Sequence, residues 1–422
     1  MKSFPVSKLI NVGLRGSTLL AKFSLLFFVA YFLEPSSVAL YGLVAATVSY
    51  SIYGLGFDFY SYSTRELLGT RSSQWLRLIR DQTVFFILMY IIVLPMLLLI
   101  FVWGFLPWSI LAWFLVLVVL EHLAQEINRL LVAMSHQLLA SIILFLRSGL
   151  WGLLVVLLFW VMPSSRNLET VFAFWCAGAG LACLIGGAKL LGLDKSTLKE
   201  AIDWRWIKRG VVVAVPLLIA TLAIRGVLTI DRYWVGALGG DDVLASYVLY
   251  AGIANAIISF LDAGVFVFLY PRLVSAVKSS DGRSYQKHMR ALLSQTVWVS
   301  LLLAVLAGTL VYPLLMILDN EVYSSYLPML YLLLAAIVLN AVSMVPHYGM
   351  YALSYDRGII VPHITALVVF IGTAALLSLW WTLYVVPVAL IITFAILLLH
   401  KTWLYRRYKR NAGNAGLVFL EY

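Results

Sequence analysis

Long apolar stretches separated by short polar segments form the main pattern along this chain. Because about 20 apolar residues in a helix cross the hydrocarbon core of a bilayer, each stretch predicts a membrane-spanning helix. We predict twelve spans, at residues 9–33, 36–60, 83–106, 108–131, 138–162, 170–189, 211–236, 243–270, 291–317, 327–353, 359–380 and 383–400. An even number of spans places both termini on the same side of the membrane.

The composition agrees with this pattern and excludes a soluble protein. Of the 422 residues, 63% are hydrophobic and 12% are charged, whereas soluble domains carry about 25% charged residues. The chain has no phosphate-binding loop of the form GxxxxGK[ST], and its six histidines form no HExxH motif. We therefore predict a transporter and not an enzyme, with no cofactor and no bound metal.

The basic residues of the polar segments predict the orientation. On alternating sides of the twelve spans, nearly all of the loop Lys and Arg residues fall on the side of the termini, with Arg166 the single exception. The positive-inside rule then predicts that both termini are cytoplasmic. The net charge of +11 is explained by this topology and by attraction to anionic lipid headgroups, so we expect membrane lipids and no nucleic acid as partners.

The longest polar segment separates six spans from six. It contains the capping-box pattern Thr197-Leu-Lys-Glu200, followed by Trp204 and Trp206 among basic residues, which predicts an interfacial helix. The alternative is a plain connector. The predicted organisation is an N-terminal six-helix bundle (1–190), a cytoplasmic interfacial linker helix (191–210), a C-terminal six-helix bundle (211–402) and a cytoplasmic tail (403–422).

The two halves share a pattern of charges. Arg15 and Lys22 lie seven residues apart in the first span, and Arg225 and Arg232 lie seven apart in the seventh. Residues seven apart share a helix face, and an even number of spans gives both halves the same direction. The predicted fold class is therefore an all-α membrane protein with twelve transmembrane helices in two six-helix bundles, related by a parallel pseudo-two-fold repeat.

Charged residues inside the spans predict a polar interior, because a lipid-facing charge at mid-membrane costs at least about 2.5–3.5 kcal/mol. These residues are Arg15, Lys22, Asp58, Glu121, Glu126, Arg129, Arg147, Arg225, Asp231, Arg232 and Asp262. The deepest cations are Lys22, Arg147 and Arg225, and a cavity lined by them suits an anionic ligand such as a phosphate. The alternative is that they pair with Glu121, Asp231 or Asp262.

The other intramembrane charges have more local explanations. Glu121 with His122, near mid-membrane, is a candidate proton-coupling site, and we include Asp231 and Asp262 as further candidates for ion coupling. Glu126 and Arg129 are spaced for a structural i,i+3 pair. For Asp58 we expect local capping. Arg232 is close enough to the outer boundary to extend its side chain to it.

Several short motifs carry a resemblance to a known family. They are Gly54-Leu-Gly56 leading to Arg65-Glu66, Pro216 with Thr229-Ile-Asp231-Arg232-Tyr233, Tyr247 at the start of the eighth span and Tyr270-Pro271-Arg272 at its end. With twelve spans in two halves, the chain up to about Arg410 resembles the polysaccharide-transport branch of the MOP exporters, the Wzx-type flippases. The resemblance implies a MATE-like, V-shaped pair of bundles around a cavity that opens alternately to each side.

The resemblance also implies a substrate and a site. The substrate would be an undecaprenyl-pyrophosphate-linked oligosaccharide, an O-antigen or capsule repeat unit, moved to the outer leaflet of the bacterial inner membrane. Its anionic headgroup would bind Arg15, Lys22 and Arg225. An H⁺ or Na⁺ gradient is a candidate drive, and a polysaccharide polymerase and a chain-length regulator are candidate protein partners. The alternatives are a MATE-like multidrug or small-solute exporter coupled to protons or sodium, whose cavity should be acidic, and a structural membrane scaffold.

Overall fold

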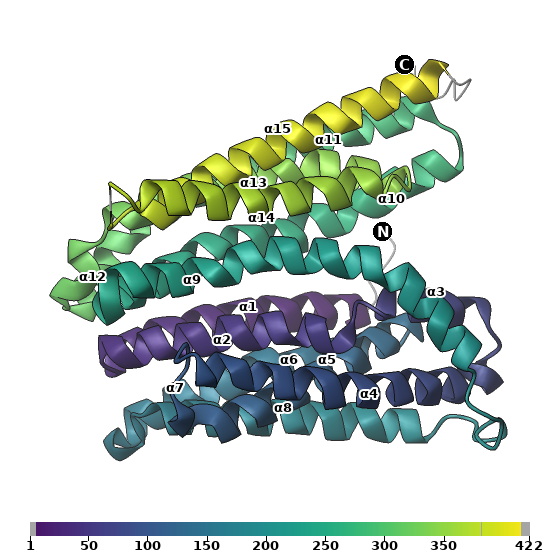
Figure 1. The fold of residues 1–422 in the computed structure, drawn as a ribbon, viewed down its shortest axis with the longest axis horizontal. Coiled ribbons are helices and arrows are strands. Elements are labelled where there is room, and N and C mark those ends of the chain that lie inside the picture. The colour runs from purple at the N-terminus through teal and green to yellow at the C-terminus, as the bar shows by residue number, and fades with distance from the viewer. Residues whose placement is uncertain (1–5, 381, 415–422) are drawn as a thin grey trace. The chain divides into compact units, whose positions relative to one another are not determined.

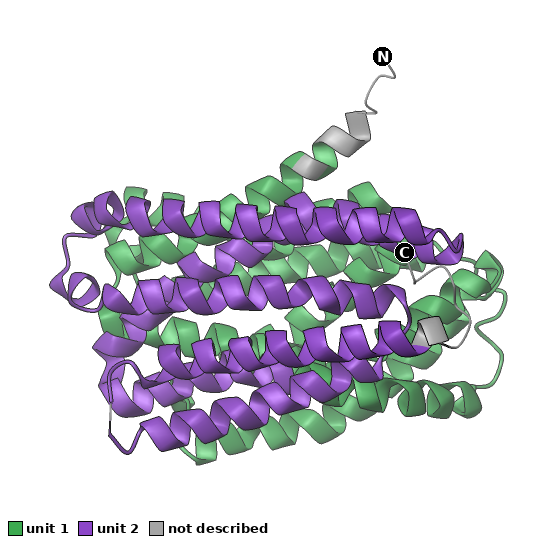
Figure 2. Ribbon diagram, turned by 90° about the horizontal axis from the view of Figure 1, so that it is seen from above, with its two compact units in different colours: residues 1–222 green, residues 223–422 purple. Residues whose placement is uncertain are grey.

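The computed structural model describes residues 6–380 and 382–414, and within these ranges the regular structure is entirely helical (Figure 1). The chain divides into two compact units, residues 1–222 and 223–422 (Figure 2). The predicted all-α fold class is therefore confirmed. The boundary between the units falls inside a helix, α9 (Trp204–Leu261), so each unit is described below by itself.

The N-terminal unit contains all six of its predicted spans. They correspond to α1 (Val6–Phe32), α2 (Pro35–Gly56), α4 (Trp75–Val102), α5 (Leu111–Ala133), the run α6–η3–α7 (Gln137–Phe145, Leu146–Leu150 and Trp151–Val161) and α8 (Leu168–Leu191). A further helix, α3 (Tyr60–Gly69), follows α2, and short 3₁₀ turns occupy η1 (Ser72–Gln74), η2 (Trp108–Ile110) and η4 (Pro163–Ser165).

Local sequence explains several of these helix boundaries. Pro35 occupies the first turn of α2, where its missing N–H costs nothing. The side chain of Asn167 caps α8 by accepting a hydrogen bond from the Thr170 N–H at 2.9 Å. At the end of α2, Phe57 and Asp58 adopt left-handed backbone conformations, with φ of 54° and 48°, which separates α2 from α3.

The predicted seventh span, residues 211–236, crosses the boundary between the two units, and the last five predicted spans lie in the C-terminal unit. It contains the rest of α9, the π-helix η5 (Asp262–Phe266), α10 (Val267–Lys278), α11 (Gly282–Leu318), α12 (Glu321–Ser325), α13 (Pro328–Ala352), α14 (Arg357–Leu377) and α15 (Val385–Asn414). The part of the predicted tail from 403 to 414 continues α15 as a helix, and residues 415–422 lie outside the described residues.

Residues 204–278 contain two membrane crossings joined by a glycine. In the described chain, eleven helical stretches are long and apolar enough to cross a membrane, and this stretch alone has 75 residues. At 1.5 Å per residue it would be about 110 Å long, against a hydrocarbon core of about 30 Å. Gly240, with φ 72° and ψ −168°, breaks α9 into two helices. All twelve predicted spans therefore have a helix in the structure.

The linker differs from the prediction. Helix α8 ends at Leu191 and α9 begins at Trp204, so of the predicted linker helix at 191–210 only residues 204–210 are helical beyond the end of α8, as the start of α9. Residues 192–203 form turns and extended chain. Two backbone carbonyls of this segment accept hydrogen bonds from Arg80 on α4 and not from helical N–H groups. Arg80 Nη1 donates to Leu198 O at 2.7 Å and to Glu200 O at 2.6 Å. The Glu200 carboxylate pairs with Arg77 and does not complete a capping box.

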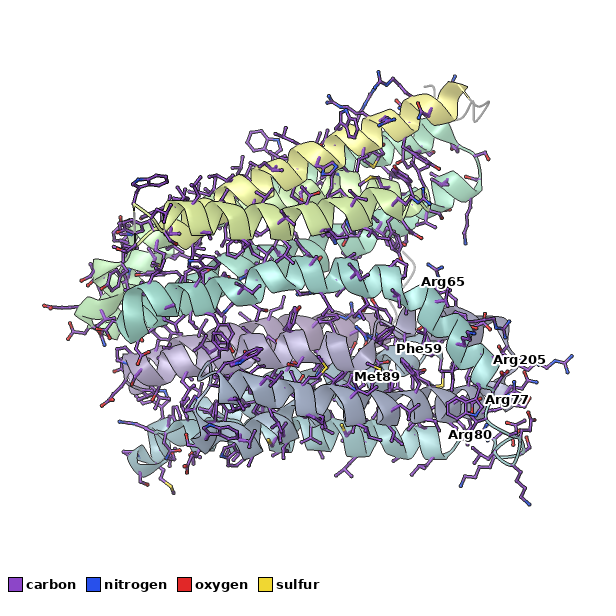
Figure 3. The ribbon with its side chains drawn as sticks, in the orientation of Figure 1. Phe59, Arg65, Arg77, Arg80, Met89 and Arg205 are labelled. Carbon is purple, nitrogen blue, oxygen red and sulfur yellow. The ribbon has the colours of Figure 1, made fainter. Side chains whose placement is uncertain are left out.

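The linker and the start of α9 are bound to the N-terminal unit by polar and aromatic contacts. Asp81, with 0% exposure, accepts hydrogen bonds from Arg80 at 2.6 Å and from the Asp203 N–H at 3.2 Å. Trp206 packs on Phe59, with ring centroids 5.3 Å apart. Figure 3 shows Phe59 at the end of the unit that also carries Arg77, Arg80 and Arg205. Residues 192–222 are thus part of the N-terminal unit.

Candidate functional site

The buried centre of the N-terminal unit is an ion pair between α5 and the π-helix η3. Arg147 Nε donates to Glu121 Oε2 at 2.6 Å, and Arg147 Nη2 donates to Gln125 Oε1 at 3.0 Å. The other carboxylate oxygen, Glu121 Oε1, accepts from Trp175 Nε1 on α8 at 2.7 Å. Glu121 is 6% exposed. Because both of its oxygens have donors, the carboxylate is satisfied without water.

Close helix packing holds this pair in place. At Gly178 on α8, an added Cβ would lie 2.8 Å from Leu146 O and 2.7 Å from Trp151 Cδ1, so only glycine permits this approach to the π-helix. Trp151 and Trp175 stack beside it, with ring centroids 5.5 Å apart and planes inclined by 7°. π-helical turns are rare and occur frequently at functional sites. Arg147 is thus presented from an unusual, well-packed segment.

Lys22 adds a second cation to this region. It lies on α1, which packs against α6, η3 and α7, and its charge interacts with those of Arg147 and Glu121. Lys22 is exposed, and its amine forms no hydrogen bond or ion pair with any described residue. It lies near the middle of the span Gly13–Phe32. Two cations here face one carboxylate, which leaves an excess of positive charge.

Arg15 lies on the same face of α1 but at a different depth. It is exposed, and seven residues place it about 10.5 Å along the helix axis from Lys22. The apolar part of α1 begins at Gly13, so Arg15 lies within one turn of that boundary. Arg15 can reach water along the helix, whereas Lys22 cannot. Lys22 is therefore the cation of α1 that needs a polar environment inside the membrane.

His122 belongs to a different network from its neighbour Glu121. His122 is fully buried, and its Nδ1 lies 2.7 Å from the hydroxyl of Tyr90 on α4. Its Nε2 has no hydrogen-bond partner within the described chain. Adjacent residues on a helix point about 100° apart, and here Glu121 faces Arg147 while His122 faces Tyr90. The structure does not bring Glu121 and His122 together into one site.

Glu126 and Arg129 form the predicted i,i+3 ion pair, which confirms that interpretation. Glu126 also accepts a hydrogen bond from Gln82 Nε2 at 3.1 Å. The Arg129 guanidinium lies over the ring of Tyr60, 3.6 Å from its centroid. Both Glu126 oxygens thus have a donor, and the Arg129 guanidinium has a carboxylate and an aromatic ring as partners, which is typical of a structural role.

In the C-terminal unit, Asp231 is the most buried carboxylate of the predicted set, at 2% exposure. Its Oδ2 accepts the Tyr247 hydroxyl at 2.6 Å, and its Oδ1 accepts Arg232 Nη1 at 3.0 Å. We expected Arg232 to extend its side chain to the outer boundary. In the structure its guanidinium instead binds the Asp231 carboxylate and the Leu228 carbonyl. A cavity of about 10 Å³ beside Asp231 and Asn255 has room for about one water.

Arg225 and Asp262 are two further charged residues of this unit. Both side chains are exposed, and their charges interact. Asp262 begins η5, the second π-helix of the chain. Of the intramembrane charges predicted from the sequence, the C-terminal unit holds two cations and two carboxylates, whereas Lys22 on α1 and Arg147 on η3 face only the carboxylate of Glu121 in the N-terminal unit.

Sequence reasoning missed several polar partners of these charges. Gln125 follows Glu121 by four residues, so its place on the same helix face could have been inferred from spacing. Trp175, Tyr90 and Gln82 come from other helices, and only the packing brings them into contact.

No family model and no curated protein sequence matches the chain. Solved structures do match in fold. An inward-facing multidrug resistance MATE family transporter of the MOP superfamily matches with a TM-score of 0.76 at 13% identity, over 95% of this chain and 97% of that one. An outward-facing structure of the same description gives 0.64 at 15% identity, over 97% and 98%. A mutant of a Vibrio cholerae MATE transporter matches with a TM-score of 0.64 at 12% sequence identity, over 96% of this chain and 98% of that one. The chain therefore has the fold of MATE transporters of the MOP superfamily, as the sequence resemblance implied.

Proposed function

We propose that this protein is a membrane transporter that works by alternating access, and that it flips a lipid-linked oligosaccharide with a pyrophosphate headgroup from the cytoplasmic to the outer leaflet. The fold supports the class of transporter, because proteins in both inward-facing and outward-facing states have been solved with it. The charge distribution supports the substrate class. The proposed location is the bacterial inner membrane, with cytoplasmic termini.

The observation that carries the proposal is the environment of Lys22. Lys22 lies near the middle of a span, and its amine forms no hydrogen bond or ion pair with any described residue. A cation left in hydrocarbon costs several kcal/mol, so this amine requires water or an anion. A pyrophosphate supplies several oxygens for an ammonium to bind as a point charge.

The ion pair of Arg147 with Glu121 leaves the proposed anion site with a net positive charge, because Lys22 adds a second cation. Glu121 and Gln125 orient the Arg147 guanidinium by fixed hydrogen bonds, and preorganised donors lose less entropy on binding an anion. The single carboxylate of Glu121 carries one negative charge, so it cannot neutralise both cations. We propose Lys22 as the primary contact of the headgroup, with Arg147 as its electrostatic support.

A MATE-like exporter of organic cations coupled to protons or sodium is the second candidate, because solved proteins with this fold are multidrug transporters. Such a site needs carboxylates that are available to a cation. Glu121 is held by Arg147 and Trp175, and Asp231 by Tyr247 and Arg232. These buried carboxylates already have their counter-charges, which favours the anionic substrate. A polysaccharide polymerase and a chain-length regulator remain proposed partners.

The test is reconstitution into liposomes with a lipid-linked oligosaccharide, followed by a leaflet-accessibility assay. We expect Lys22→Ala to reduce flipping by about tenfold to a hundredfold, because a hydrogen bond to a charged group contributes about 1.5–3 kcal/mol. Lys22→Arg should retain part of the rate. Lys199→Ala, which removes an exposed linker lysine, is the matched control. Wild-type flipping by Lys22→Ala, or transport of an organic cation with no oligosaccharide flipping, would overturn the proposal.

A further inference from the structure

Helix α1 packs along the run η3–α7, and the seam between them extends from the middle of the span to its predicted outer end. Two glycines permit the close approach. A Cβ at Gly149 would lie 3.2 Å from Thr18 Cα, and a Cβ at Gly152 would lie 3.4 Å from Leu25 Cβ. Lys22 lies between Thr18 and Leu25 on α1. The proposed headgroup contact is therefore beside this seam.

Four side chains gather at the outer end of the seam. Phe32 on α1 and Trp160 on α7 meet edge to face, with ring centroids 5.3 Å apart. The ring of Tyr31 stacks on that of Trp160, with centroids 6.3 Å apart and planes inclined by 25°. The Arg166 guanidinium lies over Phe32, with its Cζ 4.3 Å from the ring centroid. We refer to Tyr31, Phe32, Trp160 and Arg166 as the outer cluster.

The outer cluster orients Arg166 and leaves most of its donors available. Arg166 Nε donates to the Phe159 carbonyl at 2.9 Å, and the ring of Phe32 covers one face of the guanidinium. Arg166 is exposed, and its two terminal nitrogens form no hydrogen bond or ion pair with any described residue. A guanidinium that is already oriented and has free terminal nitrogens suits bidentate binding of a phosphate.

The charge of Arg166 is an exception in the chain. The predicted topology places no other Lys or Arg in an outer loop, and the positive-inside rule disfavours one there. Within residues 6–380 and 382–414, no carboxylate forms an ion pair with Arg166, so its charge is not cancelled. Capping the Phe159 carbonyl needs a donor but no charge. The charge is therefore available to a ligand.

Two aromatic rings of the outer cluster present open surface beside this charge. Trp160 is 55% exposed and Tyr31 is 40% exposed. Large aromatic rings bury much apolar area on contact, and the apolar face of a sugar ring can pack on them. Exposed Trp and Tyr are also common at membrane interfaces. An interfacial role explains the rings but not the guanidinium that lies among them.

We propose that the outer cluster is a second binding site for the substrate headgroup, in which Arg166 binds the pyrophosphate and Trp160 packs on the sugar next to it. This inference rests on the proposed function and deepens it by naming where the headgroup binds after it leaves Lys22. Phe32 follows Lys22 by ten residues, so the two sites are about 15 Å apart along α1. That distance is about half of the hydrocarbon core. The headgroup would thus move along one seam from mid-membrane to the outer boundary.

Binding at the outer cluster is tested with a photo-crosslinking amino acid at Ser164, an exposed position two residues before Arg166. In liposomes that contain undecaprenyl pyrophosphate, the full-length protein should crosslink to this lipid. Arg166→Gln should reduce the yield by about tenfold, because a charge-assisted hydrogen bond is lost. Glutamine can still donate to the Phe159 carbonyl, so a purely structural role of Arg166 predicts no loss. Arg166→Lys keeps the charge and should retain most of the crosslinking.

The second readout is the flipping of a lipid-linked oligosaccharide in proteoliposomes. Arg166→Gln and Trp160→Leu should each slow flipping several-fold. Trp108→Leu is the matched control and should flip as the wild type does. Trp108 is also expected at the outer boundary and is 56% exposed, but it packs on Phe101. Trp160→Leu should leave the crosslinking of undecaprenyl pyrophosphate unchanged, because this lipid carries no sugar.

The outcomes separate this inference from the proposed function. Crosslinking or flipping by Arg166→Gln at the wild-type level overturns the second site. Equal slowing by Trp160→Leu and Trp108→Leu overturns the sugar contact, because any interfacial tryptophan would then have the same effect. If the wild type flips no lipid-linked oligosaccharide, the proposed function fails. The crosslinking yields of the wild type and Arg166→Gln then decide whether the outer cluster binds a pyrophosphate.

Discussion

Arg147 and Glu121 form a buried ion pair at 2.6 Å although 26 residues separate them in the chain. Removing one partner leaves an uncompensated charge in an apolar bundle. We therefore expect Arg147→Leu to lower the free energy of unfolding by about 3–5 kcal/mol. The double variant Arg147→Leu/Glu121→Leu should recover much of this loss, because neither charge is then left unpaired.

Thermal unfolding in one detergent, for both single variants and the double variant, checks this prediction. The coupling between the two sites is obtained from the double-mutant cycle. Additive effects of the two substitutions would mean that the pair does not act as a unit, and that Gln125 or Trp175 alone satisfies the remaining partner.

Two neighbouring glycines on α8 provide a matched test of packing in the N-terminal unit. A Cβ at Gly186 would lie 2.3 Å from Ile127 Cγ2, whereas a Cβ at Gly187 would meet nothing within 4 Å. Gly186→Ala should destabilise the protein by about 1–3 kcal/mol through overpacking. Gly187→Ala should be neutral or stabilising by up to about 1 kcal/mol, because alanine is the better helix former. Equal melting temperatures for the two variants would contradict the close approach of α5 and α8.

Arg80 should protect the linker from proteolysis. Its guanidinium donates to three linker carbonyls, those of Leu198, Glu200 and Ala201. With Arg80→Ala the segment should open locally more often, and tryptic cleavage after Lys195 and Lys199 should be about tenfold faster. Arg205→Ala, at an exposed position on α9, is the control. If cleavage is as slow in Arg80→Ala as in the control, the linker is held by other contacts.

The hydrogen bond from Tyr247 to Asp231 predicts a measurable cost in the C-terminal unit. Tyr247→Phe keeps the ring and removes a hydroxyl that donates to a buried carboxylate at 2.6 Å. We expect a loss of about 1.5–3 kcal/mol, the range for hydrogen bonds to charged groups. Tyr355→Phe is the control, because its ring stacks on Tyr408 without a hydrogen bond to the hydroxyl among the described residues. The control should change stability by less than about 0.5 kcal/mol.

The membrane-spanning helices could be predicted from the sequence alone, because an apolar stretch of about 20 residues is typical of a helix that crosses a bilayer. It was also sufficient for Glu126 and Arg129, whose spacing places them on one helix face. The pairing of Arg147 with Glu121 was one of two interpretations that the sequence left open, since the choice depends on how η3 meets α5. The π-helices themselves leave no clear mark in the residue pattern.

The linker shows what the sequence alone could not predict. The capping-box pattern at Thr197 is a local signal, but in the structure Arg80, which precedes it by more than 100 residues, donates hydrogen bonds to the carbonyls of Leu198 and Glu200. These are tertiary contacts, which a single sequence does not reveal.

Gly240 has a consequence for protein engineering. With φ 72° and ψ −168° it turns the chain between two membrane crossings at a single residue, in a backbone conformation that L-amino acids rarely adopt. The connection between the two crossings is therefore a tight turn with no loop that could be lengthened. Epitope tags, fluorophores or glycosylation sequons inserted there would force the hairpin apart, whereas the linker at 192–203 has the length to accept them.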